Sequence, residues 1–419
     1  YNLIMEYVDK IICPRLVYLS EKDEFVKDYA IIISGNIIRD IVDKKTLKGK
    51  YKSEYIVNFP QDVFLPGFIN SHYISGNYLT HYIMEKKKNH KIFSDKLYDE
   101  EYMELSTSLC LVKMMKSGIT TNSDVSIFPK SIINIYQMCG IRLSFGLPIL
   151  THKTNWATDE NEYLKKCLEI YDEYKSYPDV TMFIALFVES MVDEKILKKI
   201  SSIVNEVDLS IRLIIEGSGA SKKQLNTIIS NLEKHNIINS GYSCVSTDSN
   251  NLFTDMAIEK KYNIISTEIR SKQIHNSSID QRTSLCIGNE TFNKSLSPIR
   301  NIENNIIKLD KSHNKDKLIS DIFSKMNLNS ALALNMKENI GSITPGKYAD
   351  LISFKIEKKI YDDYQAKDII CFSDYSTRVR NVWIGGRQVM QDYKLITINE
   401  NLLYDKIKKW IIKNNHELK

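Results

Sequence analysis

Leu65-Pro66-Gly67-Phe68-Ile69-Asn70-Ser71-His72 is the segment from which the architecture of this chain can be inferred. The apolar residues predict a buried strand over residues 64–70, and the polar side chain of His72 follows that strand. A polar residue at the carboxyl end of a buried strand is typical of sheets that carry their chemistry at one edge. The other strands of such a sheet must then lie further along the chain.

Short apolar segments alternate with helical patterns after residue 72. The further strands are predicted at residues 119–125, 142–150, 180–188, 211–216, 241–246, 263–269 and 284–288. Helices are predicted between them at residues 99–116, 160–177, 194–207, 221–235 and 250–261. Eight strands that alternate with helices predict an α/β fold, a (β/α)₈ barrel, with its functional residues where the strands end.

Strands are also predicted on both sides of this alternating region. Residues 10–17 and 30–42 are rich in Ile and Val, and Ser34-Gly35-Asn36 is typical of a hairpin turn. Residues 350–354 and 379–384 are similar, and Gly385-Gly386 indicates a second hairpin. We expect one small β-sandwich domain built from residues 1–62 and 342–400, a barrel over residues 63–341, and a C-terminal helix over residues 401–419.

The composition is typical of a globular protein in a reducing cytoplasm. Hydrophobic residues make up 43% and charged residues 26% of 419 residues, and the net charge is only +5. No basic stripe predicts a nucleic-acid partner, and no apolar run reaches the ~18 residues of a membrane span. The seven scattered cysteines form no CxxC pair, and residues 1–9 lack a secretory pattern. The charged runs 85–90 and 310–317 predict solvated loops, or a lid beside the site.

Four segments resemble landmarks of the amidohydrolase superfamily. Residues 65–72 resemble the Pro-Gly entry into a first strand that ends in His-x-His, and Ser117-Gly118-Ile119-Thr120-Thr121 is similar to the second strand. Residues 340–351 and Val382-Trp383-Ile384-Gly385-Gly386-Arg387 resemble the exit from the barrel and the last hairpin. The branch most similar in pattern contains triazine hydrolases, guanine deaminases and adenosylhomocysteine deaminases.

The resemblance implies a metal-dependent hydrolase of carbon–nitrogen type bonds in cyclic amidines and related heterocycles, acting by deamination or dechlorination. In this family a bound Zn or Fe ion lowers the pKa of a water molecule, and a carboxylate transfers protons. By resemblance the catalytic carboxylate is Glu216, and the remaining metal-binding positions are His72 and Glu290, which replaces an aspartate. The resemblance also implies a homo-oligomer.

Most histidines of the family pattern are replaced in this chain. Three ligand positions fall on Ile74, Leu213 and Ser243, and a substrate-contacting histidine falls on Phe187. Because Leu and Ile carry no lone pair, we expect the usual metal site to be absent or to bind weakly. Tyr73 and Phe187 are candidate pocket residues for a planar ligand, with Tyr78 and Tyr82 nearby.

Each of these residues also has a structural interpretation. His72 could be a polar residue retained at the barrel mouth, and Glu216 and Glu290 could be held by hydrogen bonds or ion pairs. A rearranged metal site could instead use His81, Glu189, Cys244 and His275 together with His72 and Glu290. Three hypotheses therefore remain: an altered hydrolase, a non-catalytic homologue that binds a small planar heterocycle, and a structural subunit. The sequence does not identify the substrate.

Overall fold

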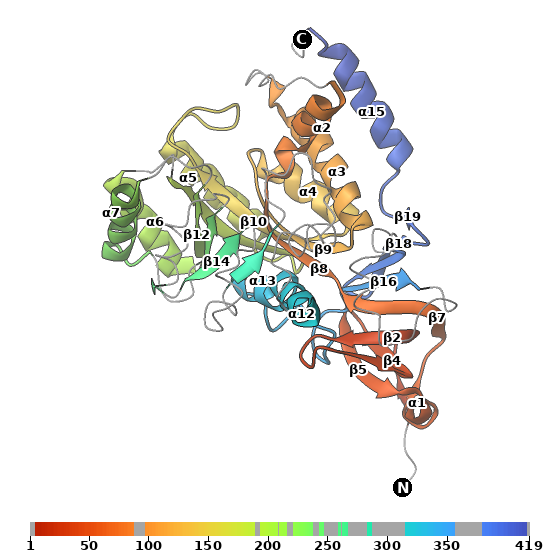
Figure 1. Ribbon diagram of the computed structural model, residues 1–419. Coiled ribbons are helices and arrows are strands. Elements are labelled where there is room, and N and C mark those ends of the chain that lie inside the picture. Colours follow the sequence, from red (N-terminus) through yellow and green to blue (C-terminus); the bar gives the residue numbers. More distant parts are fainter. Residues whose placement is uncertain are drawn as a thin grey trace. The chain divides into compact units, whose positions relative to one another are not determined.

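The computed structural model describes residues 5–87, 97–188, 193–207, 209–215, 221–237, 243–246, 259–260, 262–266, 283–286, 315–356 and 379–416. The chain divides into two compact units (Figure 1). One unit comprises Tyr1–Ile69, Lys113–Thr120 and Lys294–Ile398, and the other comprises Asn70–Val112, Thr121–Asn293 and Asn399–Lys419.

Eight strands form one parallel sheet in which neighbours follow the order of the sequence. They are β8 (Phe68–Tyr73), β9 (Ile119–Val125), β10 (Arg142–Ile149), β11 (Val180–Phe187), β12 (Ser210–Ile215), β13 (Ser243–Ser246), β14 (Asn263–Ser266) and β15 (Thr283–Leu285). The Ser71 and Ser284 hydroxyls lie 3.2 Å apart, so a side-chain hydrogen bond joins the first strand to the last. The expected (β/α)₈ barrel is confirmed.

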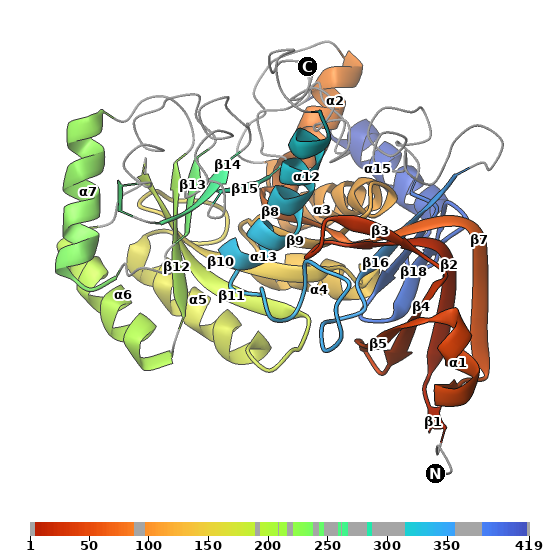
Figure 2. The same cartoon turned by 60° about the horizontal axis from the view of Figure 1, so that its bottom comes forward.

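Helices occupy most of the connections between these strands. They are α2 (Tyr78–Lys87), α3 (Glu100–Lys116), α4 (Pro129–Cys139), α5 (Glu160–Tyr174), α6 (Glu194–Val207) and α7 (Lys222–Lys234). Side chains fix where two of them begin: Asp159 accepts from the first backbone N–H groups of α5, and Ser221 and Gln224 form a capping box on α7. Figure 2 shows α6 and α7 on the same side of β12.

The predicted strand over residues 64–70 is wrong, because it covers the junction of two strands. β7 (Tyr55–Pro66) ends and β8 begins on either side of Gly67. A Cβ atom on Gly67 would lie 2.1 Å from Oγ1 of Thr120, so only glycine allows this close approach. Residues on both sides of the junction are buried, and the apolar pattern therefore continues through it without a break.

Other differences concern helices with charged sequences. The loop predicted over residues 85–90 is wrong for 85–87, which end α2, and α12 (Lys315–Met326) begins inside the loop predicted over 310–317. The helix α4 was not predicted, although Pro129 at its start and Gly140 after its end are typical of helix boundaries. Only residues 259–260 of the helix predicted at 250–261 lie within the described residues.

Segments before and after the barrel share a nine-stranded sheet. Its strands are β2 (Lys10–Leu19), β3 (Glu24–Lys27), β4 (Tyr29–Ser34), β5 (Ile37–Asp43), β7, β16 (Leu351–Lys355), β17 (Asn381–Ile384), β18 (Arg387–Gln391) and β19 (Lys394–Leu395). β7 pairs in parallel with β2 and antiparallel with β16. Gly35 and Gly385 adopt positive φ angles in the two predicted hairpin turns.

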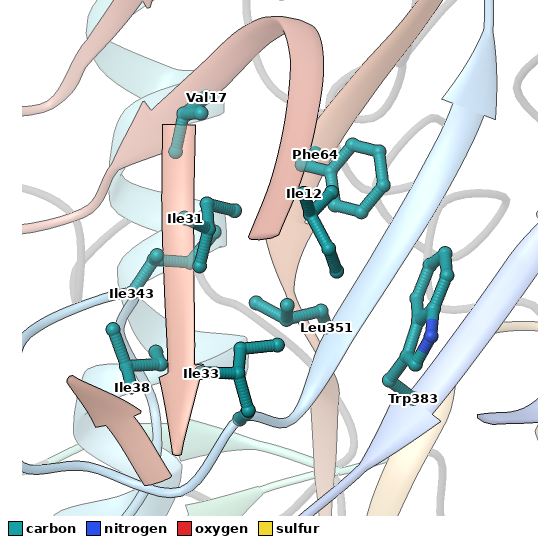
Figure 3. Close-up of a cluster of buried hydrophobic side chains, with 10 residues drawn as sticks. Ile12, Val17, Ile31, Ile33, Ile38, Phe64, Ile343, Leu351 and Trp383 are labelled. Carbon is teal, nitrogen blue, oxygen red and sulfur yellow. The ribbon is translucent and has the colours of Figure 1, made fainter. Parts of the chain in front are cut away.

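A cluster of aliphatic and aromatic side chains forms a core of this sheet (Figure 3). Ile12 and Ile31 come from strands that precede the barrel, whereas Leu351 and Trp383 come from strands that follow it. Phe64 of β7 packs against Trp383 with 5.3 Å between the ring centroids. The two sequence segments therefore depend on each other to bury their apolar side chains.

The remaining elements are short or flank the two sheets. β1 (Glu6–Tyr7) pairs with β6 (Tyr51–Lys52), and α1 (Lys44–Lys50) follows β5. α13 (Leu328–Ala333) follows α12, and α15 (Glu400–Lys413) follows the sheet. Within the described part of the chain, no helix has both the length and the apolar character required to cross a membrane.

Candidate functional site

The carboxyl ends of the parallel strands define the edge at which the predicted site residues were expected. His72 is the last residue but one of β8, and its side chain is buried. Tyr73 ends the strand, and burial raises the pKa of its hydroxyl well above the usual range. Tyr73 is therefore a neutral, mostly apolar part of this edge, as a stacking surface requires.

Ile74 lies one residue beyond β8, in extended backbone that leads into a short 3₁₀ turn, Ser75–Asn77. Asp124 of β9 holds that turn: its carboxylate accepts hydrogen bonds from the Ser75 backbone N–H at 3.1 Å and from the Ser75 hydroxyl. The hydroxyls of Tyr136 and Ser126 donate to the same carboxylate at 2.8 and 3.1 Å. Burial raises the pKa of Asp124, and these hydrogen bonds oppose that rise.

This network fixes the backbone that follows His72. Asp124 is fully buried, and a buried carboxylate with four donors is rigidly placed because any movement would leave a desolvated acceptor unpaired. Asp124 was not predicted as a site residue, although an aspartate inside an otherwise uncharged predicted strand was a signal for it. Its role follows from its contacts: it positions the turn beyond His72 and Tyr73.

Arg212 of β12 projects into the interior of the barrel. Its Nη1 donates to the Ser123 hydroxyl of β9 at 2.6 Å, and its Nη2 donates to the Ser144 hydroxyl of β10 at 3.1 Å. Two strands separate β12 from β9 in the sheet order, so this direct bond must pass through the enclosed space. Burial lowers the pKa of Arg212 to about 9, which still leaves the guanidinium charged at neutral pH.

The space around the Arg212 guanidinium is shaped by a large and a small residue. The guanidinium carbon lies 3.7 Å from the centre of the Phe183 ring, a stacking distance. A Cβ atom on Gly146 would lie 2.7 Å from that ring and 2.6 Å from Val125. Glycine at 146 therefore leaves room for Phe183, which in turn supports Arg212. Arg212 was not predicted as a site residue, although it is a charged residue in an otherwise apolar run that Glu216 follows.

The structure places the other predicted site residues in different ways. Leu213 is buried and, because side chains alternate along a strand, points to the face of β12 opposite Arg212. Ser243 begins β13 and pairs with Arg212 in the sheet register, whereas Phe187 ends β11 and is half-buried. Glu216 and Glu290 lie outside the described residues, as do Glu189 and His275.

The described residues do not fit a divalent metal ion. Within them, no three His, Cys, Asp or Glu side chains lie close enough together to hold one. Of the four metal-ligand positions that the resemblance equates with histidine, only His72 carries an imidazole, and Ile74 and Leu213 carry no donor atom.

The sequence is similar to one family model and to several deaminases. A model of the amidohydrolase family matches residues 222–389. A 5-methylthioadenosine/S-adenosylhomocysteine deaminase of Saccharophagus degradans is 22% identical over 91% of each chain. A 5'-deoxyadenosine deaminase of Methanobrevibacter smithii is also 22% identical, over 92% of this chain and 98% of its own length.

Solved structures of the same fold cover almost the whole chain. An adenosine deaminase from Xanthomonas campestris with bound zinc aligns with a TM-score of 0.81 at 16% identity, covering 99% of this chain and all of its own. A zinc complex of atrazine chlorohydrolase from Arthrobacter aurescens aligns with a TM-score of 0.77 at 12% identity, covering 96% and 99%. At these identities the alignments establish the fold.

Proposed function

We propose that this chain is an amidohydrolase-superfamily barrel that binds a planar nitrogen heterocycle of the purine nucleoside type, without the metal-dependent hydrolysis usual in the family. The relatives named above hydrolyse carbon–nitrogen bonds, as their deaminase names state. The proposed ligand is of the class on which these relatives act, but the proposed activity is binding without hydrolysis.

Two observations support a purine nucleoside as the ligand. The deaminase relatives match this chain over more than nine-tenths of its length, so barrel and flanking sheet are both retained. Aromatic residues end two strands of the barrel, Tyr73 on β8 and Phe187 on β11. Flat aromatic faces favour stacking with a planar heterocycle.

The altered chemistry is supported by the residue types at the ligand positions. A catalytic zinc site needs three protein ligands and one open position for water. Ile74 and Leu213 cannot coordinate a metal, and the hydroxyl of Ser243 is a poor replacement for a neutral imidazole. The loss of metal-dependent hydrolysis is inferred from one observation. Among the described metal-ligand positions of the family pattern, only His72 has an imidazole.

A second candidate is a hydrolase with a rebuilt metal site. It is favoured by the retention of Glu216, whose family counterpart transfers protons, and by zinc in the related structures. His72 and Glu290 would then hold the ion together with residues outside the family pattern. This candidate differs from the first in metal content, which can be measured directly.

Metal analysis after reconstitution separates the two candidates. We expect protein expressed with added zinc or iron to contain far less than one ion per chain and to release no ammonia from 5-methylthioadenosine or adenosine. The same nucleosides should raise the melting temperature, because a ligand that binds only the folded state stabilises it by mass action. One ion per chain, lost in His72→Ala and Glu290→Ala, together with ammonia release would overturn the proposal and establish the second candidate.

A further inference from the structure

Arg212 is a buried cation whose described surroundings contain no anion. Its contacts are the hydroxyls of Ser123 and Ser144 and the ring of Phe183, and among the residues that the structure describes no carboxylate reaches it. Arg142 on the neighbouring strand β10 is also buried, but it forms an ion pair with Asp179 at 2.5 Å. The comparison indicates that the surroundings of Arg212 are incomplete, because buried charges in proteins are normally paired.

The donors around the Arg212 guanidinium suit a carboxylate or phosphate group. A guanidinium has five N–H groups in one plane, and the hydrogen bonds of Arg212 to Ser123 and Ser144 use one from Nη1 and one from Nη2. Ser123 and Ser144 accept those bonds, so each hydroxyl keeps its own hydrogen for donation. Phe183 covers one face of the guanidinium and holds its plane fixed. Such a fork binds carboxylate or phosphate oxygens in pairs.

The depth of these groups suggests how a ligand would reach them. Ser123 lies two residues before the end of β9, and Arg212 lies three residues before the end of β12. At about 3.3 Å per residue, this places them roughly 7–10 Å below the carboxyl edge of the barrel. A ligand whose ring system stacks at the edge would therefore need a charged substituent that extends over that distance to contact Arg212.

We propose that Arg212, Ser123 and Ser144 form an oxyanion site inside the barrel, which binds the carboxylate or phosphate group of a small ligand. The proposal rests on the proposed function, since the neutral part of the ligand is the heterocycle considered there. It adds that the preferred ligand is anionic, and it assigns the anion to residues that belong to no metal-ligand position of the family pattern.

Three nucleosides that share an adenine ring test the site. 5-Methylthioadenosine is uncharged, S-adenosylhomocysteine carries a carboxylate beside an ammonium group, and adenosine 5′-monophosphate carries a phosphate. Calorimetry on the full chain should show at least one anionic ligand binding tenfold or more tightly than the neutral one. Arg212→Met should abolish that preference, Arg212→Lys should retain part of it, and Arg142→Met should leave it unchanged. The stronger anionic ligand identifies the source of the oxyanion.

The stability of the ligand-free variants gives an independent readout. If Arg212 lacks a partner anion, Arg212→Met should raise the melting temperature or leave it unchanged, because an apolar side chain of similar size relieves an unpaired charge. Arg142→Met should lower the melting temperature, because it leaves Asp179 without its partner. A large loss of stability in Arg212→Met would show that the protein itself supplies the counter-charge, and would overturn the oxyanion site.

The two proposals can fail separately. Neutral and anionic nucleosides that bind equally well would reject the oxyanion site and leave the proposed function intact. Inorganic phosphate that stabilises the wild type but not Arg212→Met, with no response to 5-methylthioadenosine, would support the oxyanion site and reject the purine nucleoside. Absence of any response to phosphate and to all three nucleosides would reject both.

Discussion

Gly146 and Phe183 show how one residue without a side chain determines the interior of the barrel. The Phe183 ring occupies the space in which a side chain at 146 would lie, and the same ring covers Arg212. Because packed interiors have few voids, neither residue can change in size without displacing the other. The position of the Arg212 guanidinium therefore depends on Gly146, although Gly146 has no side chain with which to contact it.

Gly146→Ala should destabilise the protein by about 1–3 kcal/mol, because the added methyl group overlaps Phe183 and Val125. Denaturant unfolding measures this change. Gly49→Ala provides the matched control: nothing lies within 4 Å of its Cβ position in α1, so alanine should be neutral or stabilising there. Equal effects of the two substitutions would contradict the packing described for Gly146.

At the scale of single elements, α2 carries His81, whose burial disfavours the positively charged form of its imidazole. Burial lowers the pKa of His81 to about 4, compared with 6.5 for an exposed histidine. The folded state therefore accepts a proton less readily than the unfolded state. Stability is complete above about pH 6.5, and is lost as the pH falls from there toward 4.

Lowering the pH from 7.5 to 5 should thus remove about 1–2 kcal/mol of stability through His81 alone. Urea unfolding at the two pH values measures the difference, and His81→Gln should reduce it by that amount. His152→Gln changes an exposed histidine and should leave the pH response intact. A pH response that persists in His81→Gln would assign it to other groups.

Elements also show what the sequence could and could not predict. Strands β9 to β12 were predicted to within one residue. β10, β11 and β12 are mostly apolar, whereas β9 is apolar only at its two ends, Ile119 and Val125. The face on which each side chain lies could not be predicted, since these strands are buried on both sides and lose the alternation of polar and apolar residues. Arg212 and Leu213 are adjacent, and only the bond to Ser123 shows which one enters the barrel.

The boundary at which the first barrel strand begins could not be predicted from the local sequence. Proline and glycine at 66 and 67 separate β7 from β8, yet apolar residues continue across them. The boundary depends on the close approach of Thr120, which lies about fifty residues away in the sequence. A contact of this kind leaves no local pattern, whereas the hairpin glycines at 35 and 385 do, because their turns need positive φ.

At the scale of the whole molecule, the flanking sheet joins chain segments that the barrel separates. Asp62 of β7 is fully buried and accepts from Arg380 at 2.7 Å and from Ser353 at 2.9 Å. Arg380 and Ser353 both belong to the segment that follows the barrel. Residues that follow the barrel in the sequence therefore both bind the Asp62 carboxylate and pack against the apolar side chains of β7.

Residues 1–66 expressed alone should fail to fold cooperatively. They lack β16, Trp383 and Arg380, so Phe64 would be exposed and Asp62 would lose its ion pair. Thermal unfolding followed by circular dichroism should show no sharp transition, unlike the full chain. Adding residues 342–416 as a separate peptide should restore a transition, and its absence in the mixture would contradict the dependence described here.

The same pairing of β7 with β16 imposes a waiting time during protein synthesis. β7 leaves the ribosome early, whereas its antiparallel partner is translated only after the barrel segment between them. At about 5–20 residues per second, that interval is roughly 15–60 s. Throughout it, β7 and Phe64 lack the partners that complete their core, and we expect chaperones to bind the nascent chain during that interval.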